Sequence, residues 1–96
     1  MKYVFDLDGT ICEERPTFER SLAAPNVEII NVINDLYIKG HFIIIFTARS
    51  WAEYTMTKEW LIENKVNHNI LMCGKIIYDK WIDDRAINVK NIKELL

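Results

Sequence analysis

The 96-residue sequence predicts an α/β domain built around a parallel β-sheet. Short apolar runs alternate with segments whose apolar residues recur at helical spacing, which is typical of parallel strands joined by crossover helices. The length fits one domain over residues 1–96, and a content of 50% apolar and 27% charged residues is that of an ordinary globular protein. We therefore expect a parallel sheet of about four strands with helices on its faces.

The first half of the chain contains the first strand and the first helix. Residues 3–5 form a short apolar run that is followed by two acids and a turn, as expected for a buried strand. Residues 11–25 are mixed and polar, and we expect a turn, a flap or a loose hairpin there. After Asn26, isoleucines and leucine at helical spacing predict a helix, and Gly40 is expected to end it.

The second half repeats the alternation. Residues 41–47 are the strongest strand signal, apolar on both faces as in a central parallel strand. Ser50 is a suitable N-cap for a helix over residues 51–64. Two further strands are expected at residues 69–73 and 78–82, and a closing helix is expected from residue 88, with an apolar face of Val89, Ile92, Leu95 and Leu96.

Composition and charge exclude several classes of protein. The longest uninterrupted apolar run, residues 42–46, is far shorter than the roughly 18–20 residues of a membrane span. The N-terminus has no secretory pattern, so we expect a cytoplasmic protein. A net charge of −2 argues against a protein that mainly coats nucleic acid phosphates. Cys12 and Cys73 form neither a disulfide framework nor a zinc ligand set, and both are expected to pack in the interior.

Polar residues follow three of the four predicted strands. Because the carboxyl ends of parallel strands meet at one edge of a sheet, where ligands bind, these residues are expected to converge. The converging residues are Asp6 and Asp8 after the first strand, Thr47, Arg49 and Ser50 after the second, Lys75 before the fourth, and Asp83 and Asp84 after it.

Such a cluster suits phosphoryl transfer. Four carboxylates in one place repel one another unless a cation binds them, and oxygen ligands favour Mg²⁺. A lysine and a hydroxyl group provide the cationic and hydrogen-bonding partners that phosphoryl oxygens need. An aspartate can itself act as the nucleophile and form an aspartyl-phosphate that water hydrolyses.

The motifs also resemble those of a known family. Asp-Leu-Asp-Gly-Thr at residues 6–10 resembles motif I of the haloacid dehalogenase superfamily of phosphatases. Thr47 matches motif II, Lys75 matches motif III, with Lys80 as a rival, and Asp83-Asp84 matches motif IV. The sequence motifs Phe-Thr-Ala-Arg and Gly-Lys-x-x-Tyr-Asp-x-x-Ile-Asp-Asp-Arg are similar to those of small, capless capsular polysaccharide biosynthesis phosphatases. The resemblance implies a three-layer, Rossmann-like core without a cap domain.

The resemblance also implies roles for individual residues. Asp6 would attack the phosphorus and bind Mg²⁺. Asp8 would protonate the leaving group, activate water and bind the metal through its carbonyl. Thr47 and Lys75 would stabilise the phosphoryl oxygens. Asp83 and Asp84 would complete the metal site, with the direct ligand unassigned.

Other residues near these motifs are candidates for substrate binding, namely Gly9, Thr10, Ala48 and Arg49. Two roles are open for the Arg49 side chain. It would either bind a remote anionic part of the substrate or pair with Asp83, Asp84 or a helix end. Trp51 would line the substrate entrance or pack in the core or a subunit contact.

The residues predict Mg²⁺-dependent hydrolysis of a phosphate monoester through an aspartyl-phosphate. The resemblance implies that the substrate is a sugar phosphate or similar metabolite of polysaccharide biosynthesis. The expected partner is a small phosphorylated substrate rather than a membrane or nucleic acid, and a homo-oligomer is left open. One alternative is a polynucleotide end phosphatase, which the net charge disfavours. An alternative of another class is a non-catalytic module that binds a metal or phosphate.

Overall fold

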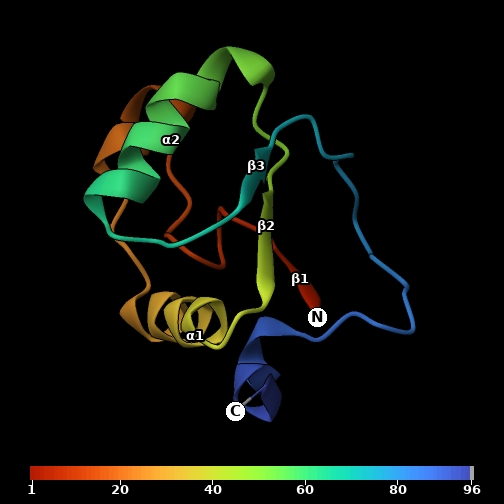
Figure 1. Cartoon of the computed structure of the whole chain (residues 1–96). Helices are drawn as coiled ribbons and strands as arrows, with labels where there is room; N and C mark the ends of the chain where they lie inside the picture. Colours follow the sequence, from red (N-terminus) through yellow and green to blue (C-terminus); the bar gives the residue numbers. More distant parts are fainter. Residues whose placement is uncertain (96) are drawn as a thin grey trace.

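A computed structural model describes residues 1–95 and contains a three-stranded parallel sheet in the order β1-β2-β3. Strand β1 spans Lys2–Phe5, β2 spans Phe42–Phe46 and β3 spans Ile70–Met72. The register pairs Val4 with Ile44 and Ile44 with Ile70. Helix α1 connects β1 to β2 and helix α2 connects β2 to β3 (Figure 1). The predicted α/β class with a parallel sheet is confirmed.

Helix α1 spans Val27–Ile38 and follows the predicted start and stop signals. The Asn26 side chain accepts a hydrogen bond from the backbone N–H of Ile29 at 3.4 Å, which caps the first turn. Gly40 ends the helical segment with φ +92°, a left-handed conformation that glycine adopts without a steric penalty. The buried side of α1 packs on the sheet through Ile29, Ile30, Val32, Ile33 and Leu36.

The helix expected over residues 51–64 consists of the short 3₁₀ helix η2, Trp51–Glu53, and helix α2, Tyr54–Glu63. Trp60 on α2 donates its indole N–H to the carbonyl of Ala23 at 3.0 Å. This bond ties α2 to the segment expected as a flap, which contains the 3₁₀ helix η1, Thr17–Leu22. That segment therefore packs against α2, and three of its residues, Ile11, Cys12 and Ala23, are buried.

Both α-helices cover the same face of the sheet, on the left in Figure 1. Phe5, Ile43, Ile45 and Leu71 are buried against them in one core. The residues that alternate with these point to the other face of the sheet, where Val4 is 61% exposed and Ile70 and Met72 are 39% and 40% exposed. The expected three layers are therefore wrong for residues 1–95, in which helices pack on one face only.

The fourth strand, expected at residues 78–82, is absent from the described structure. Residues 74–88 run without regular structure on the opposite side of the sheet from α1 and α2 (Figure 1). Ile82 is 91% exposed. The rings of Tyr78 and Trp81 instead contact each other, with centroids 5.0 Å apart. An apolar run forms a strand only when a neighbouring strand pairs with it, and within residues 1–95 no strand pairs with residues 78–82.

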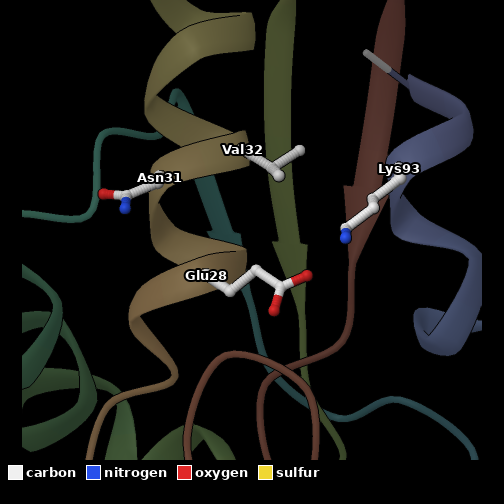
Figure 2. Close-up of a pocket in the computed structure, with 4 residues that line it drawn as sticks. All are labelled: Glu28, Asn31, Val32 and Lys93. Atoms are coloured by element: carbon white, nitrogen blue, oxygen red, sulfur yellow. The ribbon is translucent and has the colours of Figure 1, made fainter.

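The closing helix is present as the 3₁₀ helix η3, Val89–Leu95, while Leu96 lies outside the described residues. Ile92 anchors η3 in the core. A shallow hollow between α1 and η3 is lined by Glu28, Asn31, Val32 and Lys93, with the Glu28 and Lys93 side chains facing each other (Figure 2). None of the predicted site residues lines it. No helix within residues 1–95 is both long and apolar enough to cross a bilayer.

His68 connects α2 to the loop before β3. Its Nε2 atom lies 2.6 Å from the Lys58 ammonium nitrogen, and its Nδ1 atom lies 2.9 Å from the Val66 carbonyl oxygen. These partners fit a neutral ring that donates from Nδ1 and accepts at Nε2. Burial, with the nearby Lys58 charge adding to it, lowers the pKa of His68 below its usual value.

We predict that the free energy of unfolding decreases as the pH falls from 7 through about 6.5. In that range the unfolded chain gains a proton on His68 that the folded chain binds only at lower pH, so acid favours unfolding. The pH-dependent part should be lost in His68→Gln and kept in His41→Gln, measured by urea denaturation at several pH values. An identical pH profile for His68→Gln and the wild type would contradict the assignment.

Candidate active site at the carboxyl edge of the sheet

The chain turns sharply after β1 and presents two acids at the edge of the sheet. The Leu7 carbonyl accepts hydrogen bonds from the backbone N–H groups of Thr10, Ile11 and Cys12 at 3.1, 2.8 and 3.2 Å. Leu7 is fully buried, whereas Asp6 and Asp8 on either side of it are partly exposed. Gly9 completes the turn with φ +83°, which explains why glycine stands there. The turn fixes Asp6 and Asp8 on the same side of the sheet edge.

Lys75 reaches Asp6 from the loop after β3. Its backbone N–H donates to the Thr47 carbonyl at 2.9 Å, extending the pairing of β2 and β3 beyond the strands. Its ammonium nitrogen lies 3.5 Å from Asp6 Oδ1, and the Thr10 hydroxyl donates to Asp6 Oδ2 at 3.5 Å. The rings of Tyr78 and Trp81 lie 5.2 and 5.4 Å from the same nitrogen. The predicted residues Asp6, Thr10 and Lys75 are therefore brought together, while Lys80 is exposed.

Thr47 and Ala48 follow β2 at the same edge. The Thr47 backbone N–H donates to the Met72 carbonyl at 2.9 Å, which fixes the end of β2 against β3. The Thr47 side chain is buried, and its hydroxyl oxygen accepts the backbone N–H of Arg49 at 3.1 Å. Ala48 is exposed. In this conformation the Thr47 hydroxyl shapes the turn that leads into Arg49.

Arg49 pairs with Asp8 rather than with the partners expected from the sequence. Its Nη2 donates to Asp8 Oδ1 at 2.7 Å and its Nε donates to Oδ2 at 2.9 Å, a bidentate ion pair. Its Nη1 donates to the Thr57 hydroxyl at 3.0 Å. Burial acts to lower the pKa of Arg49, but the hydrogen bonds and charge of Asp8 outweigh it and the pKa is raised. Of the two alternatives for Arg49, pairing with Asp83, Asp84 or a helix end is therefore wrong as to the partner, which is Asp8.

Thr57 was missed by the sequence analysis. It is fully buried on α2 and lies one turn before Trp60 and Leu61, on the same apolar side of the helix. A polar residue on the buried face of a helix needs a hydrogen-bond partner, and that is the signal that points to Thr57.

Asp83 and Asp84 do not meet the other acids in the described structure. Both are exposed on the segment 74–88. The Asp83 carboxylate accepts the backbone N–H of Arg85 at 2.9 Å and the indole N–H of Trp81 at 3.4 Å, and the first of these bonds lowers the pKa of Asp83 most. Residues 1–95 contain no group of three or more His, Cys, Asp or Glu side chains able to hold a metal ion. The expected four-carboxylate cluster is therefore not assembled.

The donors at the sheet edge fit part of a Mg²⁺ shell. The Asp6 side chain is 39% exposed and offers the carboxylate oxygens that Mg²⁺ prefers. Both carboxylate oxygens of Asp8 are already hydrogen-bonded to Arg49. Because Mg²⁺ keeps several waters and often binds through one or two carboxylates plus phosphate, Asp6 can begin such a site, and the remaining ligands must come from elsewhere.

Cys12 lies beside Asp8, yet it is not suited to act as a nucleophile. Its sulfur is 3.7 Å from Asp8 Oδ1 and its side chain is buried. Burial first, and then the neighbouring Asp8 charge, raise the pKa of Cys12 to about 12. The protonated thiol is a weak nucleophile at neutral pH, which leaves Asp6 as the exposed nucleophilic group of this edge.

Comparisons with known proteins define the fold more than the function. No protein-family model matches the sequence, and no curated protein is found to be similar. A crystal structure of a target protein from Vibrio cholerae has 25% sequence identity and a TM-score of 0.80, covering 98% of this chain and 94% of that chain.

Two further solved structures share the fold over part of a larger chain. A chain of a Pnkp1/Rnl/Hen1 complex has 21% identity and a TM-score of 0.67, with 98% of this chain and 33% of that chain covered. A chain of the Pnkp1/Rnl/Hen1 RNA repair complex has 19% identity and a TM-score of 0.67, with 97% and 30% covered. This chain therefore has the fold of a unit found within a chain of an RNA repair complex.

Proposed function

We propose that this chain is a Mg²⁺-dependent phosphomonoester hydrolase that acts through an aspartyl-phosphate on Asp6. The observation that carries the proposal is the contact between the partly exposed Asp6 carboxylate and the Lys75 ammonium group, 3.5 Å apart, at the carboxyl edge of the sheet. Asp6 and Lys75 follow β1 and β3, and Thr47 follows β2 between them, at the edge where open parallel sheets bind ligands.

The residues at this edge supply the parts of the reaction. Asp8, which is paired with Arg49 as a carboxylate, first takes up a proton from solvent. An Asp6 oxygen then bonds to the phosphorus as the ester bond to the leaving oxygen breaks, and Asp8 gives that oxygen the proton. Water then attacks the aspartyl-phosphate and returns a proton to Asp8, releasing phosphate and restoring Asp6. Lys75 balances the negative charge on Asp6 and on the phosphoryl group. The backbone turn at Gly9 and the hydroxyl of Thr10 position Asp6 for the attack.

Mg²⁺, when bound, would neutralise charge on the phosphoryl oxygens and on Asp6. Asp6, the Asp8 carbonyl and either Asp83 or Asp84 would hold it. This set requires the segment 74–88 to move toward the edge of β1. The outer edge of β1 has no strand paired with it among residues 1–95, and the segment exposes Ile77 and Ile82 at 86% and 91%. Pairing as a fourth strand would bury these side chains and bring Asp83 and Asp84 to the site.

Asp6→Asn should abolish hydrolysis of an aryl phosphate in Mg²⁺, because the amide cannot form the aspartyl-phosphate. Asp35→Asn, which alters a surface ion pair on α1, serves as the control and should keep wild-type turnover. Phosphate release measured with and without Mg²⁺ tests the proposal, and equal activity of Asp6→Asn and the wild type would disprove it. Mg²⁺ binding without turnover on a broad panel of phosphates would instead support a non-catalytic binding module.

Closure of the segment 74–88 should protect it from protease. Trypsin is expected to cut after Lys80 and Arg85, which are exposed, and Mg²⁺ with inorganic phosphate should slow both cuts. Replacing Asp83 and Asp84 together by Asn should remove the protection, whereas Asp79→Asn should keep it. Cleavage rates that do not respond to Mg²⁺ would rule out the movement. The readout does not depend on turnover.

A polynucleotide end phosphatase is the second candidate. Its support is the shared fold with a chain of an RNA repair complex, together with three half-exposed aromatic side chains near Lys75, which are Trp51, Tyr78 and Trp81. An added side-chain carbon at Gly74 would lie 3.2 Å from the Trp51 indole nitrogen, so Trp51 borders the same loop. Nucleobases stack on exposed aromatic rings of this kind. Comparing turnover on a sugar phosphate and on a 3′-phosphorylated oligonucleotide distinguishes the two candidates.

A further inference from the structure

We propose that Arg49 is a positioning residue that fixes the carboxylate of Asp8, and that helix α2 sets its orientation through Thr57. This inference rests on the proposed function, since it assigns a role in the same reaction. It differs from both roles that the sequence left open for Arg49, which were substrate binding and pairing with Asp83, Asp84 or a helix end.

The contacts of Arg49 are all directed into the protein. Its guanidinium group meets both oxygens of Asp8, the Thr57 hydroxyl and, at 3.9 Å, the sulfur of Cys12. The residue is only 3% exposed. Four of the five guanidinium N–H donors are directed at partners inside the protein, and the group is almost fully enclosed, so little of it is open to a phosphorylated substrate. Its position therefore fits an effect on Asp8 better than a contact with the substrate.

The Arg49 residue is held both at its backbone and at its guanidinium group. The Thr47 hydroxyl accepts the Arg49 backbone N–H at 3.1 Å, which fixes the start of the side chain at the end of β2. The Thr57 hydroxyl accepts from Nη1 at 3.0 Å, which fixes the far end against α2. Thr57 is itself fully buried beside the core residue Leu61. The direction of the Asp8 carboxylate thus depends on how α2 packs on the sheet.

This arrangement requires arginine rather than a general positive charge. The planar guanidinium group offers parallel N–H donors that match the two oxygens of a carboxylate, and lysine offers a single point of contact. A lysine at position 49 would hold the Asp8 carboxylate at a single point and fix its plane less firmly. In the proposed reaction Asp8 transfers a proton in both steps, so its orientation affects turnover rather than substrate affinity.

Steady-state kinetics on an aryl phosphate in Mg²⁺ test the role. Arg49→Lys should lower kcat by at least about tenfold and leave KM within about twofold, because misplaced catalytic groups cost rate. Thr57→Val should also lower kcat, whereas Thr57→Ser, which keeps the hydroxyl, should have the kcat of the wild type. Thr55→Val, on the exposed side of α2, is the matched control and should match the wild type.

A large rise in KM with kcat retained in Arg49→Lys would overturn the inference and make Arg49 a substrate-binding residue. Unchanged kcat in both Arg49→Lys and Thr57→Val would overturn it as well. If Arg49→Lys fails to fold, as judged by circular dichroism, the comparison of Thr57→Val with Thr57→Ser carries the test.

A double-mutant cycle separates failure of this inference from failure of the proposed function. The urea midpoints of Asp8→Asn, Arg49→Gln and the double variant report the ion pair without any need for activity. We expect the two single shifts not to add, and additive shifts would overturn the inference even in an active enzyme. If the midpoint shifts of the variants are coupled but the wild type has no turnover, the proposed function and the positioning role are both disproved. The Arg49–Asp8 contact would then be a structural ion pair.

Discussion

The parallel pairing of β1 with β2 is the constraint on which the rest of this structure depends. With Phe5 opposite Ile45, both strands end at the same edge of the sheet. Asp6 and Asp8 leave from one strand while Thr47 and Arg49 leave from the next, so residues about 40 positions apart in sequence become neighbours. An antiparallel arrangement would send the two groups to opposite edges. The turn closed by the Leu7 carbonyl then decides which acid meets which cation.

The two acids after β1 have different surroundings. Asp6 is 39% exposed and lies 3.5 Å from the ammonium nitrogen of Lys75, whose side chain is 12% exposed. Asp8 is more buried, and both of its carboxylate oxygens accept hydrogen bonds from Arg49, whose side chain is almost fully buried. Breaking the second pair would leave a buried charge without a partner, which is costly. The edge thus combines one partly exposed carboxylate, Asp6, with one carboxylate, Asp8, whose orientation an ion pair fixes.

The free edge of β1 and the segment 74–88 form a second, separate feature of the fold. A short parallel sheet with helices on one face leaves Val4 and its neighbours only partly covered. The segment across from that face carries its own exposed isoleucines and is held by contacts among Lys75, Tyr78 and Trp81. These local contacts are individually weak compared with strand pairing and burial. Residues 76–87 of this segment are exposed, with no strand or helix to hold them.

Local interactions account for the elements that were predicted correctly from the sequence. The spacing of isoleucines in residues 27–38, the cap at Asn26 and the glycine at position 40 together predicted α1, and the apolar run at 42–46 predicted β2. Asp6 and Lys75, which were expected at one edge of the sheet, lie 3.5 Å apart, although Lys75 follows β3 and no fourth strand follows it within residues 1–95. These features follow from hydrophobic periodicity and chain direction, which a sequence carries in its local pattern.

The tertiary structure alone decided the contacts that depend on packing. Residues 78–82 have the composition of a strand, but a strand needs a partner, and no local pattern records whether one is available. From the sequence, several acids were possible partners for Arg49. The packing of α2 places the Thr57 hydroxyl beside Arg49, and Arg49 pairs with Asp8. Long-range pairs of this kind arise from how whole elements pack together, so the neighbouring residues in the sequence do not reveal them.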